Sequence, residues 1–227
     1  QDFDILISCG RKSVIPSIYL KKNSKKKVFN IHIQDPKVSL NNFNIVIAPE
    51  HDGLNGKNVI TSKGALHYLT LKEIKNNHDY LLNKIDKDKD YLLLILGGPN
   101  KYYNYDHQNL INIFNKVKVI LNNNNLKAII IPSMRTPKKT IDLASEQIGE
   151  ENFVVKDIDK KAYLSGLSLA KYIVVTCDST SIISEASMTG KPIYIADLPP
   201  KRHDLRFKKF RKLFSELNIT KNLNKKL

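Results

Sequence analysis

The first third of the chain alternates short apolar runs with polar turns, a pattern that predicts several strands and few helices. Each run is three to six residues long. That is too short for most helices and typical of strands buried in a parallel sheet. One short helix is expected at 13–20, and helical character returns at 70–82. The expected strands are 3–8, 28–33, 44–48 and 59–61.

The rest of the chain alternates strand and helix patterns more regularly. In one expected helix, Leu110, Ile113, Phe114 and Val117 recur with the helical period. Strands that alternate with helices predict an α/β fold whose parallel sheet is covered on both faces. The expected strands are 91–96, 128–132, 153–155, 172–176 and 192–196. The expected helices are 106–121, 138–149, 162–171, 180–189 and 207–217.

A charged segment, KIDKDKD at 84–90, separates these two patterns and reads as a solvated linker. The 227 residues suffice for two small domains, each with its own core. The sequence therefore predicts an N-terminal Rossmann-like domain at 1–86 and a C-terminal Rossmann-like domain at 87–227.

Composition narrows the cellular setting. No apolar run approaches the roughly 20 residues that a membrane-spanning helix needs. The two cysteines, Cys9 and Cys177, lack metal-ligand spacing and do not form the framework of a secreted disulfide scaffold. A reducing cytoplasm is the simple interpretation. Cys177 adjoins a candidate site, but we interpret it as a small residue at a strand end rather than a nucleophile.

The net charge of +15 indicates an anionic partner. The chain is also rich in Lys, Asn and Ile, so compositional drift explains part of this charge. No stretch combines basic and aromatic residues as a nucleic-acid stacking platform does, and no nucleic-acid partner is expected. The tail at 201–227 carries ten Lys or Arg against two acidic residues. Such clusters bind anionic lipid at about 1 kcal/mol per basic residue, so peripheral attachment to the inner face of a membrane is an option.

The strongest candidate chemistry follows the expected strand at 172–176. Ser179, Thr180 and Ser181 are suited to cap the next helix, whose free N–H groups and dipole favour a phosphate. Glu185 lies about one turn further along, where its two oxygens match the vicinal diol of a ribose. An ordinary capped helix with a solvated glutamate is the alternative.

Two further loops follow neighbouring strands. Gly97 and Gly98, followed by Asn100, let a backbone approach a ligand closely, and Arg135 is available to neutralise a diphosphate. A simple turn and a solvated arginine are the alternatives. Ligands of open parallel sheets bind beyond the carboxyl ends of the strands, so the three loops are expected to form one donor site. Its expected residues are Gly97, Gly98, Asn100, Arg135, Ser179, Thr180, Ser181 and Glu185.

The first part carries candidate acid–base residues at its own strand ends. Asp35 and His51 are candidate general bases, and Arg11, Asp52 and His67 are candidate acceptor-side residues. A loop His or Asp more often serves as a hydrogen-bonding or capping residue. The run from Glu50 to Asp52 lacks the helical His spacing of a metalloenzyme, so no metal is expected.

Several motifs together resemble a known family. These are the stretch from IQDPKVSLNNFN to TSKGALH, then LGGPNKYY, PSMRTP and VVTCDSTSIISEASMTGKPIYI. They are similar, in order and spacing, to the mitochondrial fission (elongated-mitochondria) family and its bacterial members. The resemblance implies a GT-B fold, in which two Rossmann-like domains face each other across a cleft. Family members begin with a further strand and an Asp-Gly-Arg-x-Gly-like loop, so it also implies an incomplete N-terminal domain here.

The resemblance also implies roles. Bacterial members are described as glycosyltransferases, and a plant member is described as promoting mitochondrial division. The segment 179–185 is similar to the nucleotide-sugar site of the GT-B enzyme that adds N-acetylglucosamine in peptidoglycan synthesis. That similarity implies a ribose contact at Glu185 and phosphate contacts at Ser179, Thr180 and Ser181.

The expected function is transfer of a sugar from a nucleoside diphosphate donor to a lipid-linked or cell-envelope acceptor. The expected enzyme is metal-independent and has no tightly bound cofactor, and Asp35 or His51 deprotonates the acceptor. The alternative is a non-catalytic adaptor at a membrane surface, and a nucleotide-sugar epimerase is a weaker third option. The sequence specifies no oligomeric state.

Overall fold

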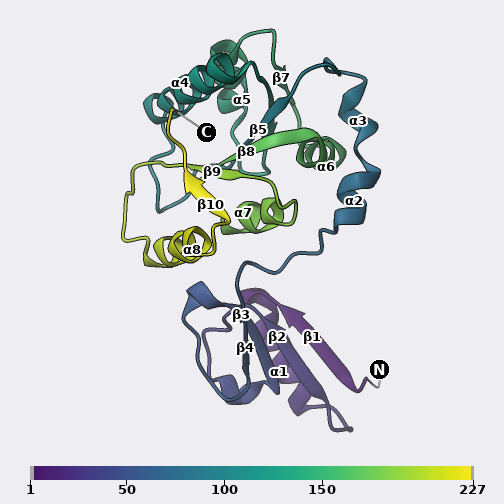
Figure 1. Cartoon of the computed structure of the whole chain (residues 1–227). Coiled ribbons are helices and arrows are strands. Elements are labelled where there is room, and N and C mark those ends of the chain that lie inside the picture. The colour runs from purple at the N-terminus through teal and green to yellow at the C-terminus, as the bar shows by residue number, and fades with distance from the viewer. Residues whose placement is uncertain (1–2, 226–227) are drawn as a thin grey trace. The chain divides into compact units, whose positions relative to one another are not determined.

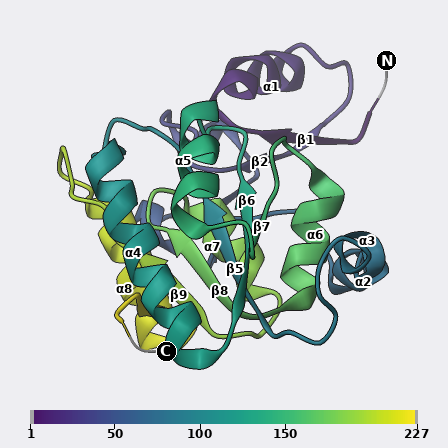
Figure 2. The ribbon, with the colours of Figure 1, turned by 90° about the horizontal axis from the view of Figure 1, so that it is seen from above.

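The computed structural model describes residues 3–225 and divides the chain into two compact units. The first ends at Leu66 and the second begins at His67 (Figure 1). This division differs from the predicted boundary at 86/87. The segment between the two positions forms α2 (Leu71–Asn76) and α3 (Asp79–Leu82), which lie beside α6 (Lys160–Leu169) in Figures 1 and 2.

A buried hydrogen bond explains why this segment belongs to the second unit. The backbone N–H of Leu81 donates to Ser165 Oγ at 3.0 Å, and that hydroxyl donates to the carbonyl of His78 at 2.8 Å. Leu81 is almost completely buried in the core of the second unit. The charged stretch at 84–90 is therefore a connection inside one unit rather than a linker between two.

The first unit is built on a four-stranded parallel sheet in the order β1-β2-β3-β4. Val14, Phe43 and Val46 form its small core. The helix α1 (Val14–Lys22) connects β1 to β2, and the short 3₁₀ turns η1 (Arg11–Ser13), η2 (Leu40–Asn42) and η3 (Glu50–Asp52) follow strand ends or loops. The strands are β1 (Ile5–Cys9), β2 (Phe29–Ile33), β3 (Ile45–Pro49) and β4 (Val59–Ser62).

The second unit is a doubly wound domain. Its six-stranded sheet has the order β10-β9-β8-β5-β6-β7, with every paired strand parallel. The strands are β5 (Tyr91–Leu96), β6 (Lys127–Pro132), β7 (Phe153–Val154), β8 (Ala170–Thr176), β9 (Ile193–Ala196) and β10 (Thr220–Asn222). The remaining helices are α4 (His107–Asn124), α5 (Lys138–Ile148), α7 (Thr180–Ser187) and α8 (Leu205–Glu216).

The strand order places helices on both faces and creates a switch point. The chain runs outward through β6 and β7 and then returns to β8 on the other side of β5. Right-handed crossovers in opposite directions put their helices on opposite faces, and Figure 1 shows α4 and α5 on one side of the sheet with α7 and α8 on the other. The reversal between β5 and β8 is the topological switch point at which α/β sheets bind ligands.

The apolar patterns account for this core. All six residues of β5 are buried, as expected of a central strand covered on both faces. The helix α6 packs closely on the sheet at Gly166, which has no side chain. A Cβ atom at this position would lie only 2.7 Å from Ile131 Cδ1. The predicted α/β class with parallel, Rossmann-like sheets is confirmed.

Some element boundaries differ from the prediction. The helical stretch at 70–82 is two short helices rather than one. The helix expected at 162–171 ends at Leu169, and its last two residues already belong to β8. The sequence also missed β10, because its three residues TKN are polar and lack a strand pattern.

No helix within residues 3–225 combines the length and the apolar character needed to cross a bilayer. The basic helix α8 is amphipathic, and it turns Phe210 and Phe214 into the core of the second unit. Its apolar side is therefore occupied by protein. A membrane contact of this helix, which stays a prediction, would rest on its charges.

Candidate functional site

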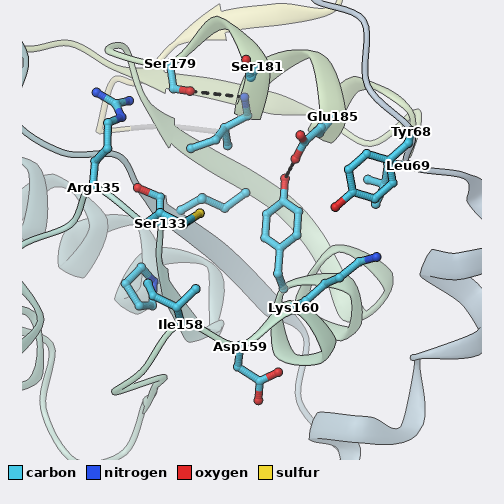
Figure 3. Close-up of a pocket in the computed structure, with 15 residues that line it drawn as sticks. Tyr68, Leu69, Ser133, Arg135, Ile158, Asp159, Lys160, Ser179, Ser181 and Glu185 are labelled. Carbon is cyan, nitrogen blue, oxygen red and sulfur yellow. Dashed lines mark hydrogen bonds between the residues drawn. The ribbon is translucent and has the colours of Figure 1, made fainter. Parts of the chain in front are cut away.

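A cavity of about 460 Å³ lies in the second unit, at the carboxyl ends of β5 and β6 and beside α7 (Figure 3). It therefore occupies the edge of the sheet at which the switch point predicts a ligand. The residues that line it are Tyr68, Leu69, Ile95, Pro132, Ser133, Met134, Arg135, Ile158, Asp159, Lys160, Tyr163, Ser179, Ser181, Ile182 and Glu185.

Four of the eight predicted donor-site residues line this cavity: Arg135, Ser179, Ser181 and Glu185. Figure 3 shows Arg135 and Ser179 at one end and Glu185 at the other. Ser179 is the N-cap of α7, and its hydroxyl accepts a hydrogen bond from the backbone N–H of Ile182 at 3.4 Å. The first turn of α7, with its N–H groups and the positive end of its dipole, thus borders one end of the cavity.

A buried carboxylate, Asp178, organises the loops behind this end. Its side chain is fully buried and accepts hydrogen bonds from Thr176 Oγ1 at 2.6 Å and from the backbone N–H of Gly98 at 3.0 Å. Arg135 Nη2 lies 2.8 Å from the same carboxylate. The sequence interpretation passed over Asp178, although its place between the strand and the cap was a usable signal.

The two glycines have a different role from the predicted one. A Cβ atom on Gly97 would lie 2.2 Å from the Asp178 carboxylate, and one on Gly98 would lie 2.1 Å from the backbone oxygen of Arg135. The close approach that requires glycine is therefore made by the protein's own loops. These glycines build the site and do not line the cavity directly.

Asn100 is also part of the scaffold. Its Oδ1 accepts from the backbone N–H groups of Tyr102 at 2.7 Å and Tyr103 at 3.1 Å. Its Nδ2 donates to the backbone carbonyl of Asp178 at 3.3 Å. The side chain thus closes the turn after β5. Thr180 begins α7 and contributes its carbonyl to the hydroxyl of Ser184.

Arg135 is held in place while part of its guanidinium stays accessible. Its side chain is 42% exposed. Nη1 donates to the carbonyl of Gly98 at 3.2 Å, and Nη2 also points to the carbonyl of Asp178 at 3.4 Å. A guanidinium has five N–H donors in a planar fork, so donors remain for an anion at the cavity.

The opposite end of the cavity carries a carboxylate. The hydroxyl of Tyr163, on α6, donates to Glu185 Oε2 at 2.7 Å, which is the dashed line that ends at Glu185 in Figure 3. Burial and the charge of Glu185 raise the pKa of Tyr163, so the phenol keeps its proton and remains a donor. The sequence interpretation missed Tyr163, since nothing in the local pattern shows that α6 brings it to α7.

Apolar and basic groups complete the walls. Ile158 is 56% exposed and Met134 is 90% exposed although both line the cavity. Together they give the wall of the cavity an apolar surface, as is usual for sites that bind small molecules. Lys160 Nζ lies 4.8 Å from the centre of the Tyr68 ring and 3.4 Å from Glu73 Oε1.

Cys177 is buried behind the same loop. Burial raises its pKa to about 12, and its sulfur accepts a hydrogen bond from the backbone N–H of Leu198. The group is therefore a neutral thiol at physiological pH. These features support the interpretation of Cys177 as a structural residue.

The candidate acid–base residues occupy strand ends of the first unit. Arg11 is exposed in η1, and Asp35 follows β2 and pairs with Lys37. The His51 side chain is fully buried, and its Nε2 lies 3.8 Å from Asp52 Oδ1. A general base must contact the proton that it removes, and the burial of His51 does not favour that role, which stays a prediction.

His67 corrects another expectation, because it belongs to the second unit and not to the first. The role of Asp35 stays a prediction. Among residues 3–225, no group of three or more His, Cys, Asp and Glu side chains has an arrangement that could hold a metal ion.

Solved structures share this architecture. The UDP-GlcNAc 2-epimerase from Neisseria meningitidis, solved with UDP-GlcNAc bound, is similar with a TM-score of 0.55 at 14% identity. The match covers 95% of this chain and 69% of that one. At this identity, the similarity establishes a common fold.

Two relatives are similar in sequence. An uncharacterised protein from Rickettsia prowazekii, RP120, is 26% identical over 266 aligned positions, which cover 99% of this chain and 73% of the relative. The mitochondrial fission protein ELM1 of Arabidopsis thaliana is also 26% identical, over 84% of this chain. This chain spans only about half (51%) of the Arabidopsis protein. The family profile described as Mitochondrial fission ELM1 matches residues 1–227, and the chain therefore belongs to that family.

Proposed function

We propose that this protein is a glycosyltransferase that binds a nucleoside diphosphate sugar in the cavity of its second unit. The observation that carries the proposal is the chemical contrast between the two ends of the cavity. Arg135 and the first turn of α7 offer cationic and N–H groups, whereas Glu185 offers a carboxylate. A diphosphate suits the first end, and a hydroxyl-rich ribose suits the second.

The spacing along α7 fits one ligand. Ser181 and Glu185 are four residues apart and face the same cavity. Four residues correspond to about 6 Å along the helix axis. A diphosphate and the ribose attached to it span a distance of this order. The exposed side chain of Ile158 adds an apolar surface to the wall of the cavity.

The same arrangement suits the proposed reaction. Breaking the bond between sugar and diphosphate develops negative charge on the leaving oxygen. Arg135 and the α7 N–H groups are preorganised at that position, and removing one such donor from an active site typically lowers kcat about 100- to 1,000-fold. Because these groups supply the positive charge, the proposal needs no metal ion. Asp35 or His51 is the candidate base for the acceptor.

An epimerase that acts on the nucleotide sugar alone is the second candidate. Its support is the similarity in fold to an epimerase solved with UDP-GlcNAc. The two activities differ in their products. A glycosyltransferase releases free nucleoside diphosphate in proportion to glycosylated acceptor, whereas an epimerase converts the nucleotide sugar without any acceptor.

Calorimetry tests the binding step of the proposal. The protein is titrated with UDP, GDP and ADP sugars, and one of the three is expected to bind. Glu185→Ala should weaken that binding about tenfold or more, because the ribose hydroxyls lose their acceptor. Glu216→Ala, at an exposed position on α8, is the matched control and should bind as the wild type does. Absence of binding to all three, or unchanged binding in Glu185→Ala, would overturn the proposal.

A further inference from the structure

We infer that Tyr163 is a positioning residue that holds Glu185 for a ribose diol and thereby makes the site select ribonucleotides over deoxyribonucleotides. This inference rests on the proposed function. It assigns the selectivity of the site to a contact between two helices rather than to the glutamate alone.

The geometry leaves Glu185 ready to accept. The Tyr163 hydroxyl donates to Oε2 at 2.7 Å, and both side chains line the cavity. An ionised carboxylate has about four lone-pair positions on its two oxygens. The phenol occupies one of them on Oε2. Oε1 and the remaining position on Oε2 can accept from two neighbouring hydroxyls.

Tyr163 is a suitable anchor because its own helix cannot shift easily. The neighbouring residues Leu164, Ser165 and Gly166 are buried, and Gly166 lies against Ile131 of β6. A tyrosine has only two side-chain torsions, whereas a glutamate has three and is mobile when unpaired. The hydrogen bond therefore transfers the rigidity of α6 to the carboxylate on α7.

The protonation of the phenol supports this role. Burial comes first among the causes that raise the pKa of Tyr163, and the Glu185 charge and the nearby Tyr68 act in the same direction. Tyr163 therefore donates to Glu185 throughout the neutral range. A donor that never becomes an anion keeps the carboxylate in one orientation.

The selectivity arises because a carboxylate in a fixed position accepts more hydrogen bonds from a ribose than from a deoxyribose. A carboxylate held in place loses one hydrogen bond when the 2′-hydroxyl is absent and cannot rotate to recover it. A mobile carboxylate can turn to water or to the remaining hydroxyl. Glu185 should thus discriminate strongly between ribonucleotides and deoxyribonucleotides when Tyr163 holds it, and only weakly when that hydrogen bond is removed.

The test compares Kd values for UDP, GDP and ADP with those for their 2′-deoxy counterparts. For whichever diphosphate binds, the wild type should prefer the ribonucleotide by about tenfold, the value of roughly one hydrogen bond. Tyr163→Phe should reduce the preference to less than about threefold. Tyr172→Phe, which changes a tyrosine near the amino end of β8 and so far from the carboxyl ends of the strands, should retain the preference. Thermal melts establish that each variant is folded.

Glu185→Gln provides a second variant that keeps the side-chain shape. It should also lose the preference, although Tyr163 is intact. If Tyr163→Phe weakens both forms by the same factor, or leaves the ratio unchanged, Tyr163 is merely structural and the inference fails. If the wild type binds one diphosphate but does not distinguish the deoxy form, the inference fails while the proposed function stands. If the wild type binds none of the diphosphates, both fail.

Discussion

Arg135 Nη2 lies 2.8 Å from Asp178 Oδ2, and this ion pair joins a guanidinium that is 42% exposed to a carboxylate with no exposed surface. The buried member fixes the accessible member. Asp178 also receives the N–H of Gly98 and the hydroxyl of Thr176, so one side chain unites three loops that follow β5, β6 and β8. The position of the cationic end of the cavity therefore depends on a residue that a ligand does not reach.

Replacing Asp178 should strongly destabilise the second unit. In Asp178→Ala, the N–H of Gly98 and the hydroxyl of Thr176 lose a charged acceptor, and such a hydrogen bond typically contributes about 1.5–3 kcal/mol. The free energy of unfolding in urea measures the loss. Asp142→Ala, at an exposed position on α5, is the control and should change stability by less than about 0.5 kcal/mol. A loss of similar size in both variants would contradict the account of Asp178.

Gly98→Ala should reduce the stability of the protein because the new methyl group collides with a neighbouring loop, and not because alanine disfavours the backbone conformation at this position. Its Cβ would lie 2.1 Å from the Arg135 backbone oxygen, so one loop must move. Overpacking of this kind costs about 1–3 kcal/mol and should also displace Arg135. Gly190→Ala is the matched comparison, since φ there is +67° and a Cβ would meet no atom within 4 Å. Gly98→Ala should therefore weaken nucleotide binding, whereas Gly190→Ala should affect stability alone. Equal nucleotide binding by the two variants would contradict this assignment.

The two thiols should differ sharply in reactivity. Cys9 is exposed, whereas Cys177 is buried and its pKa is raised to about 12. Reaction requires the thiolate and access to it. Titration of the folded protein with a disulfide reagent should therefore modify one thiol rapidly and the second only after urea is added. Cys9→Ser should abolish the rapid phase. Rapid modification of Cys177 in the folded Cys9→Ser variant would overturn the structural interpretation of this residue.

Acid should remove the contribution of Asp204, which ties α8 to the core. Burial acts to raise the pKa of Asp204, but the hydrogen bond from Tyr103 at 2.7 Å and the Arg211 charge outweigh burial, so the pKa is lowered. A lowered folded-state pKa stabilises the protein above the ordinary value of about 3.9, and the contribution disappears as the pH falls through the folded pKa.

Tyr103→Phe should therefore destabilise the protein by about 1.5–3 kcal/mol at pH 7, the range for a hydrogen bond to a charged group. The difference from the wild type should shrink as the pH falls below about 4. Tyr102→Phe is the control. The Tyr102 ring packs against Phe207, and a phenylalanine should keep the stability that this ring contact contributes. Urea unfolding at pH 7 and pH 3 supplies the comparison. A Tyr103→Phe difference that does not change with pH would contradict the assignment.

The sequence predicted the parts of the molecule that depend on local pattern. The continuous apolar run of β5, the helical period of α4 and the cap at Ser179 each follow from neighbouring residues. The edge of the sheet that carries the site also followed, because carboxyl ends of parallel strands lie together. These features need no knowledge of distant contacts.

The remaining features depend on residues that are far apart in sequence. Tyr163 meets Glu185 only because α6 and α7 border one cavity. The need for glycine at Gly97 comes from Asp178, about 80 positions later, and not from a ligand. The observed domain boundary differs from the predicted one because the hydroxyl of Ser165 binds the backbone N–H of Leu81 and so joins this segment to the second unit. The pattern of neighbouring residues in the sequence does not predict such contacts.

The most direct test of the central claim is a crystal structure of the protein grown with the nucleoside diphosphate that binds best in calorimetry. Density is expected in the cavity of the second unit, with the diphosphate at Arg135, Ser179 and Ser181. Both ribose hydroxyls are expected within hydrogen-bonding distance of Glu185. A nucleotide bound elsewhere, or one whose ribose avoids Glu185, would contradict the account.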